Sequence, residues 1–153
     1  MAAPLYDVTV RTSVTTSGGA LVQLVPPVGN VATGRVVRLR EICISNTTAT
    51  AFGVGLGIAT VAAVTPATAA TIAKRNPLVD PAAISLVWTT FATTPTAPAG
   101  YHKRLWIPAS SLVIYSFAEG EELLVLPNAT PLPFCVWNTG TGQVADISLT
   151  WSE

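Results

Sequence analysis

The sequence predicts an all-β domain, an antiparallel β-sandwich for which the jelly roll is the favoured arrangement. Short runs of alternating apolar and polar residues recur along the chain and are separated by turn residues. β-Branched residues and threonine are frequent, and 12 Pro and 11 Gly argue against a helical bundle. With 153 residues, the chain fits one domain over residues 1–153, large enough to bury a core without disulfide or metal support.

The first half of the chain predicts four strands in succession. Val8 and Val10 alternate with polar neighbours, and the pattern stops at a Ser-Gly-Gly turn. A short apolar run over residues 20–25 ends at Pro26. In the region around residues 51–60, Gly alternates with large apolar residues, which is a strand pattern with one cleared face. The four predicted strands cover residues 7–14, 20–25, 35–46 and 51–60.

The third of these strands changes character near its middle. Val37 and Leu39 lie on one parity, whereas Ile42 and Ile44 lie on the other. A regular strand would therefore place these two apolar pairs on opposite faces. The sequence predicts a β-bulge around Glu41, or a strand that passes there from an exposed edge into the core.

A long Ala/Thr/Pro-rich stretch follows, at about residues 61–81, and is predicted to be a loop that binds something or is ordered by a neighbour. Strand character returns at residues 84–91, and the C-terminal third predicts five short strands separated by turn residues. The last strand alternates apolar residues with Asp146, Ser148 and Thr150, so one face should be apolar and the other polar and solvent-facing. The five strands are residues 102–107, 112–117, 122–126, 134–137 and 144–151.

Charge is scarce in this chain. Only 10% of the residues are charged and the formal net charge is +0, against about a quarter charged in an average soluble domain. No long-range field would attract nucleic acid or an anionic membrane, so neither is expected as a partner. A near-neutral protein tends to associate, and we expect a homo-oligomer, a dimer or a trimer.

An uncharged stretch over residues 49–73 is long enough to cross a bilayer. Its first part has a period of two, with Gly53, Gly55 and Gly57 at alternate positions. Three such glycines would each cost a helix about 1 kcal/mol. The stretch therefore favours a strand over a membrane-spanning helix.

Residues for catalysis or metal binding are few. The only histidine, His102, lies beside Lys103 and Arg104, two cations that do not supply the partner of a paired base. Glu121 and Glu122 would point to opposite faces of a strand and cannot act as a carboxylate pair. There is no CxxC, HxxxH or calcium-binding loop spacing. We expect no enzymatic activity, no cofactor and no metal site.

Two charged sets are the main candidates for an interface: Arg35, Arg38 and Arg40, and Glu119, Glu121 and Glu122. They are either two solvated patches or groups that pair across a subunit boundary and set its orientation. Both interpretations remain open.

Aromatic residues offer a further candidate surface. Most of the four tryptophans lie on strand parities that favour core packing, although Trp and Tyr rings could also stack against sugars. Tyr101, which follows Gly100, is the ring most expected to be exposed.

The two cysteines, Cys43 and Cys135, each lie in an apolar run and are expected to be buried as small hydrophobic residues. The spacing does not establish whether they form a bridge. The N-terminal residues lack the basic and apolar regions of a secretory signal. Synthesis in the cytoplasm is expected.

Two passages resemble small structural proteins of tailed bacteriophages. Residues 38–51, RLREICISNTTATA, are similar to a strand of that group, and residues 105–108, 120–123 and 136–138 resemble its closing strands. The resemblance implies a virion component, a head decoration (cement) protein of jelly-roll type that binds the major capsid protein on the capsid exterior. A glycan- or host-surface-binding module of a head fibre, neck or tail is the alternative. No site residue is carried over from the group.

Overall fold

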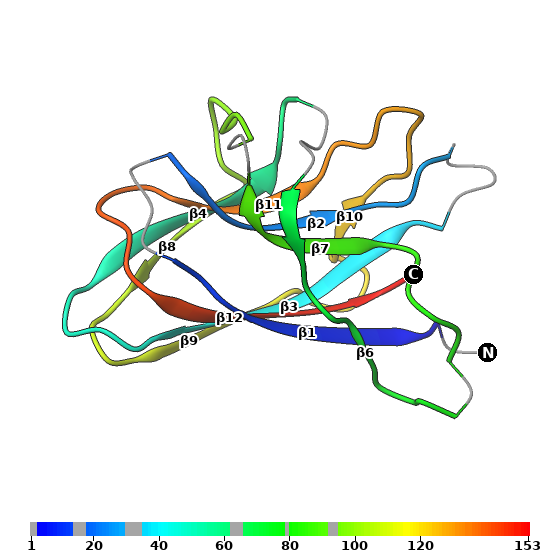
Figure 1. Ribbon diagram of the computed structural model, residues 1–153, viewed down its shortest axis with the longest axis horizontal. Helices are drawn as coiled ribbons and strands as arrows, with labels where there is room; N and C mark the ends of the chain where they lie inside the picture. Colours follow the sequence, from blue (N-terminus) through cyan, green and yellow to red (C-terminus); the bar gives the residue numbers. More distant parts are fainter. Residues whose placement is uncertain (1–2, 14–17, 30–34, 62–65, 79, 92–94) are drawn as a thin grey trace.

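The structure, a computed structural model, is a two-layered β-sandwich (Figure 1). It describes all residues except 1–2, 14–17, 30–34, 62–65, 79 and 92–94. The described residues form twelve strands and no helix. Two six-stranded sheets, in which all the paired strands are antiparallel, face each other. The predicted all-β antiparallel sandwich is confirmed.

Sheet A contains the first and the last strand of the chain. Its strand order is β10-β3-β12-β1-β6, and β9 also pairs with β3, on the same side as β10. The strands are β1 (Leu5–Arg11), β3 (Val37–Asn46), β6 (Ala73–Lys74), β9 (Leu112–Ser116), β10 (Leu123–Val125) and β12 (Ala145–Ser152).

Sheet B forms the second layer, in the order β5-β7-β2-β11-β4-β8. Its strands are β2 (Ala20–Val25), β4 (Phe52–Ile58), β5 (Pro66–Ala69), β7 (Leu86–Phe91), β8 (Lys103–Ile107) and β11 (Phe134–Asn138). Every strand that the alternation pattern predicted is present among the described residues, with ends that differ by a few residues, and position 14 at the end of the first predicted strand lies outside the described residues.

The pairings between the two ends of the chain are nested. Strand β1 pairs with β12, β2 with β11, β3 with β9, and β4 with β8. Counting inward from both ends of the chain, each strand of the N-terminal half therefore pairs with a strand of the C-terminal half. The chain is arranged as one long hairpin whose strands are divided between the two sheets. Strands β5, β6 and β7 interrupt this pattern between β4 and β8.

The core lies between the two sheets. Along β12 the odd-numbered residues from Ala145 to Trp151 are fully buried, whereas Asp146, Ser148 and Thr150 are only half-buried. The apolar and wet faces predicted for this strand are confirmed. Trp151 stacks on Tyr6 of the neighbouring β1, with ring centroids 5.9 Å apart. Burying two large aromatic side chains in this way contributes strongly to the stability of sheet A.

The bulge predicted in the third strand is present at Arg40. Strand β12 pairs Thr150 with Glu41 and Trp151 with Leu39, so Arg40 is an extra residue on β3. Because of this extra residue, Leu39 and Ile42 point into the same core although their parities differ. The apparent conflict in the sequence pattern is resolved by one residue.

The predicted loop at about residues 61–81 contains two short strands in its described part. Strand β5 pairs with β7 in sheet B, and β6 pairs with β1 in sheet A. Strand β6 has two residues, and the β5–β7 pairing shifts register twice. Such short, irregular strands depend on the edges of sheets that other residues have already formed, which is why local alternation does not reveal them.

Candidate functional site

A charged pocket of about 380 Å³ lies on the outer face of sheet A. Its walls come from segments that are far apart in the sequence: β1, β3, β9, β12, the residue Arg75 and the link between β9 and β10. The pocket is lined by Leu5, Arg40, Glu41, Arg75, Ser116, Phe117, Glu119, Glu122 and Thr150.

The pocket forms because the edge of sheet A is interrupted opposite the bulge. Along β3, β9 ends opposite Glu41 and β10 begins opposite Leu39. The chain between β9 and β10 leaves the sheet in a turn, whose Gly120 has a φ of 84°. The Phe117 amide donates to the Arg40 carbonyl at 2.8 Å, which fixes the point where the chain departs.

Arg40 is the central cation of this pocket. Its side chain is half-buried, and among the described residues its Nε atom has no hydrogen-bond partner although it is buried. Glu41, Glu119 and Glu122 line the same pocket. In the described part of the chain, ion pairs join Arg75 to Asp7 and Arg11 to Asp146, and none joins Arg40 to a glutamate. Arg40 and the glutamates therefore give the pocket positive and negative charges, and no ion pair joins them in the described part of the chain.

The opposite wall of the pocket is held by a two-point ion pair. Arg75 Nε and Nη2 each donate to a carboxylate oxygen of Asp7 at 2.9 Å, and the Thr150 hydroxyl donates to the same carboxylate at 2.6 Å. Burial alone would raise the pKa of Asp7. The hydrogen bonds from Arg75 and Thr150 and the Arg75 charge outweigh it, so the pKa of Asp7 lies below its ordinary value.

The structure brings together only part of the predicted interface set. Arg40, Glu119 and Glu122 line one pocket of a single chain, and pairing of either charged set across a subunit boundary stays a prediction. Arg38 is exposed on β3, Arg35 is exposed before this strand, and Glu121 is exposed in the β9–β10 turn. Sequence reasoning did not identify Asp7 and Arg75, since β6 was not predicted and neither residue belongs to a dense charged run.

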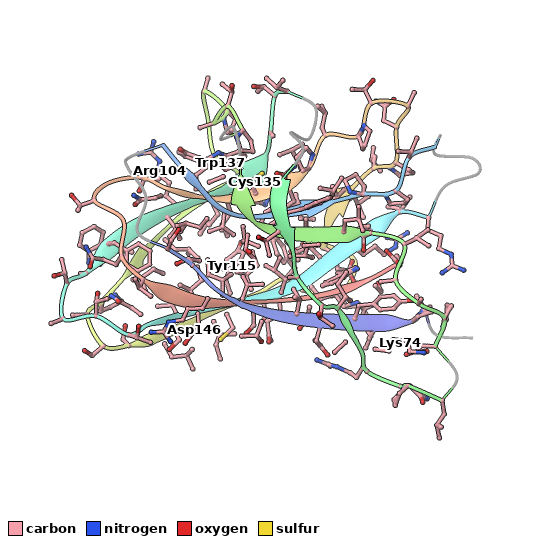
Figure 2. The ribbon with its side chains drawn as sticks, viewed as in Figure 1. Lys74, Arg104, Tyr115, Cys135, Trp137 and Asp146 are labelled. Atoms are coloured by element: carbon pink, nitrogen blue, oxygen red, sulfur yellow. The ribbon has the colours of Figure 1, made fainter. Side chains whose placement is uncertain are left out.

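Tyr101 is half-buried, which differs from the exposed ring that we expected. It belongs to a small cluster on the outer face of sheet B, together with the buried Trp137 and Cys135, both of which Figure 2 labels. Its ring is 5.9 Å from that of Trp137, and the Arg104 guanidinium is 5.1 Å from its centroid. The ring lies directly over Gly55 of β4. The glycines predicted to clear one face of this strand therefore make room for aromatic side chains.

Trp106 is the large ring that the structure leaves exposed. Trp137 and Trp151 are fully buried and Trp88 is half-buried, whereas Trp106 on β8 is 68% exposed. The expectation that most of the tryptophans pack in a core or at an interface agrees with the buried Trp137 and Trp151, whereas interface packing of the exposed Trp106 stays a prediction. Strand β8 is an edge strand, so one face of this indole has no neighbouring strand to pack against.

Both cysteines are free. Cys135 is buried on the outer side of sheet B, and Cys43 is half-buried on the outer face of sheet A, so the two sheets separate them. Burial raises the pKa of both thiols, and the charge of Glu41 raises that of Cys43 further. At neutral pH the thiol form is therefore favoured at both positions.

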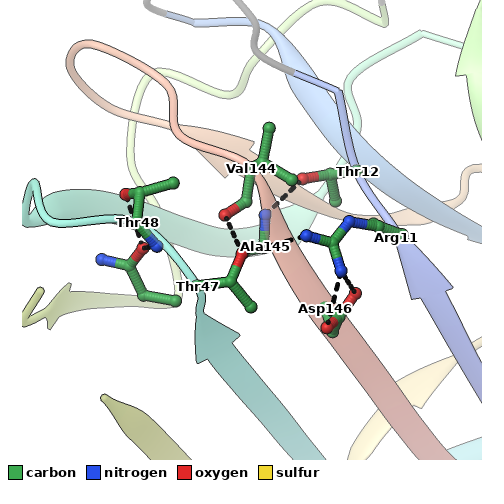
Figure 3. A network of polar contacts seen from close by, with 8 residues as sticks. Arg11, Thr12, Thr47, Thr48, Val144, Ala145 and Asp146 are labelled. Atoms are coloured by element: carbon green, nitrogen blue, oxygen red, sulfur yellow. Dashed lines mark hydrogen bonds and ion pairs between the residues drawn. The ribbon is translucent and has the colours of Figure 1, made fainter. Parts of the chain in front are cut away.

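A second polar network ties the start of β12 to the ends of β1 and β3 (Figure 3). Arg11 donates to Asp146 at 3.4 Å and to the Thr47 hydroxyl at 3.2 Å. The Thr12 hydroxyl accepts a hydrogen bond from the Ala145 amide at 3.1 Å. These groups satisfy one another at the end of sheet A, so their role is to hold three strands together.

No group of three or more metal-binding side chains is present in the described part of the chain. No helix among the residues that the structure describes is long and apolar enough to cross a membrane. The sequence matches no protein-family model, and comparisons with curated proteins and with solved structures give no match.

Proposed function

We propose that this chain is a non-enzymatic virion structural protein, a decoration (cement) protein that binds the major capsid protein on the capsid exterior. It acts as a homo-oligomer, a dimer or a trimer. Its mechanism is the burial of protein surface, which links neighbouring capsid subunits and stabilises the shell.

The observation that carries this proposal is the combination of scarce charge with exposed apolar side chains. Charged residues make up 10% of the chain, while Leu78 is 93% exposed, Val28 75% and Trp106 68%. Isolated exposed apolar residues are ordinary. On a surface with so few charges, however, they favour burial against other protein.

The strand order favours the jelly-roll arrangement. The orders β1-β12-β3-β9 and β2-β11-β4-β8 contain the nested pairings expected of a jelly roll. Jelly rolls are common in viral capsid and lectin domains.

We propose that the charged pocket sets the orientation of this chain on the major capsid protein. A contact of standard size buries about 1,600 Å², and many copies on one shell turn modest affinities into a stable lattice. A pocket with unpaired charges of both signs favours a partner segment with complementary charges and rejects other orientations. We assign the pocket around Arg40 to the contact with the major capsid protein.

The test is the binding of the purified chain to empty heads of the phage that encodes it, assembled without this protein. We expect Arg38→Ala with Arg40→Ala to weaken binding by about tenfold at low salt, and to reduce its salt dependence, while the fold stays intact. Arg104→Ala, on the outer side of sheet B, is the matched control. Equal binding of both variants and the wild type would remove the pocket from the contact, and no binding by the wild type would refute the proposed function.

A glycan- or host-surface-binding module is the second candidate, favoured by the exposed Trp106. Its indole lies over the Gly53 side of β4, near the cluster that holds Tyr101, and exposed aromatic rings can stack on sugars. A glycan array, followed by titration of the intrinsic Trp fluorescence, separates the two candidates. Saturable quenching by a specific sugar, lost in Trp106→Ala, would favour this second function.

A further inference from the structure

The edges of the two sheets differ in how well they are protected against pairing with another strand. Strand β6 has two residues and includes Lys74, and β10 has three residues. Strand β8 carries Lys103 and Arg104, while β5 begins with Pro66 and has an irregular register. Short length, charge, proline and irregularity all discourage the addition of a further strand.

Strand β9 lacks each of these protections. It has five residues, Leu112–Ser116, pairs with β3 without a register shift, and lies in a segment, residues 105–118, that carries no charge. Leu112 is 56% exposed and Ile114 is 57% exposed, both on the outer face of sheet A. An uncharged, regular and apolar edge of this kind is a template for strand addition.

The hydrogen bonds to β3 show which backbone groups of β9 are open. The Asn46 amide donates to the Ser111 carbonyl, and the Phe117 amide donates to the Arg40 carbonyl, both at 2.8 Å. Antiparallel ladders alternate, so the odd-numbered residues of β9 bond to β3. The amide and carbonyl groups of Leu112, Ile114 and Ser116 therefore point away from the sheet, and no other strand in the described part of the chain pairs with them.

We propose that β9 pairs with β9 of a second copy of this chain, so that sheet A continues across a two-fold axis. One antiparallel register uses all the open groups of the strand. It places Ile114 opposite Ile114 of the partner subunit, and Leu112 opposite Ser116 of the partner subunit. In this register each open amide and carbonyl gains a partner.

The side chains suit a second copy as the occupant. The two Ile114 side chains become direct cross-strand neighbours, which favours pairing between apolar β-branched residues. No charge lies on β9, so two identical edges meet without like-charge repulsion, and the whole chain has a net charge of +0. An isologous contact of this type closes as a dimer and leaves no open edge on β9 to propagate.

This interface rests on the homo-oligomer that we propose above, and of the β9 residues only Ser116 also lines the pocket assigned to the capsid contact. It is tested on the purified full chain in the absence of capsids. A failure of β9 pairing therefore leaves capsid binding to be judged by its own experiment, and the reverse also holds.

The first experiment is sedimentation velocity over a range of protein concentrations. We expect a dimer for the wild type and its loss in Ile114→Lys, because two lysines would face each other at the axis. Leu78→Lys introduces the same charge at an exposed leucine outside the sheets and should leave the dimer intact. Circular dichroism and thermal unfolding of both variants confirm that each is folded.

The second experiment tests the register by disulfide trapping in a Cys43→Ser background. Opposed residues of a hydrogen-bonded pair have Cα atoms about 5.5 Å apart, within the range of a disulfide. Oxidation of Ile114→Cys should therefore give a covalent dimer. The two copies of residue 112 would be about 14 Å apart along the strands, so Leu112→Cys should give none.

Covalent trapping of Ile114→Cys but not of Leu112→Cys, together with dimer loss in Ile114→Lys, establishes the β9 interface. A wild type that is monomeric at every concentration overturns it. A dimer or trimer that persists in Ile114→Lys, with no trapping at residue 114, also overturns it and places the contact elsewhere.

Discussion

Single residues on the outer side of sheet B show how glycine serves packing in this fold. Gly55 lies beneath the ring of Tyr101, at a position where a methyl group would overlap ring carbons. The same ring contacts Trp137 and Arg104. A backbone position without a side chain therefore allows an aromatic cluster to sit directly on the sheet.

We predict that Gly55→Ala lowers the free energy of unfolding by roughly 1–3 kcal/mol, because the added methyl group must displace the Tyr101 ring. Urea unfolding measures the change. Gly100→Ala is the matched control, since its added methyl group meets nothing within 4 Å. In a Tyr101→Ala background the cost of Gly55→Ala should shrink; the same cost in both backgrounds would contradict the assigned contact.

Asp7 makes the free energy of unfolding depend on pH in the acidic range. Its pKa is lowered in the folded protein, so its stabilising effect is complete above the pKa of the unfolded chain, about 3.9. That effect is lost as the pH falls through the lower folded-state pKa. Arg75 and Thr150 supply the hydrogen bonds that cause this dependence.

Asp7→Asn should therefore reduce the free energy of unfolding at pH 7 by roughly 0.5–1 kcal/mol, a magnitude limited by the exposure of the pair. The difference from wild type should diminish below about pH 4. Thermal unfolding across this pH range measures both effects. Asp146→Asn, whose contact with Arg11 is longer at 3.4 Å, should cost less. A constant difference at all pH values would show that Asp7 acts by packing and not by charge.

At the scale of elements, β3 illustrates how far pattern reasoning reaches. The mismatch in parity between Leu39 and Ile42 predicts an irregularity near Glu41, and the extra residue is Arg40. The pattern does not predict that β9 and β10 meet β3 on either side of the same point. That coincidence creates the pocket, and it depends on strand pairing far along the chain.

Deletion of Arg40 tests the bulge directly. Without this residue the remaining sequence alternates regularly, with Leu39 and Ile42 still facing the core. We predict a folded protein whose free energy of unfolding is lower by about 1 kcal/mol, the value of the lost bond from the Phe117 amide. Urea unfolding gives the result.

Deletion of Cys43 is the matched control, because it removes one residue of the same strand where no bulge exists. It should turn the apolar residues on one side of the deletion toward solvent, with a severe loss of stability. Equal losses in the free energy of unfolding for the two deletions would contradict the assignment of Arg40 as the extra, unpaired residue of the bulge.

Elements that lack a local signal were the ones that the sequence did not predict. Strands β5 and β6 lie in an Ala/Thr/Pro-rich stretch and form only as additions to β7 and β1. Arg75 follows β6, so its ion pair with Asp7 was hidden for the same reason. By contrast, Arg40, Glu119 and Glu122 belong to dense charged runs, and this density identified three residues of the pocket.

At the scale of the whole molecule, composition and architecture support one account. A chain with 10% charged residues folds into two sheets whose exposed positions include Trp106 and the uncharged edge of β9. Alternation along the strands was sufficient to predict the sandwich, because one face of each sheet must be buried. Partners could not be predicted in the same way, since no residue pattern states what covers an outer face.

The most direct test of the proposal that this chain is a capsid decoration protein is its copy number in purified particles of the phage that, on this proposal, encodes it. Quantitative mass spectrometry against the major capsid protein gives this number. The account predicts many copies, in a fixed ratio to the capsid protein, because decoration places one oligomer at each repeated site of the shell. A handful of copies per particle would indicate a neck or tail component. Complete absence from the particle would contradict a structural role in the virion.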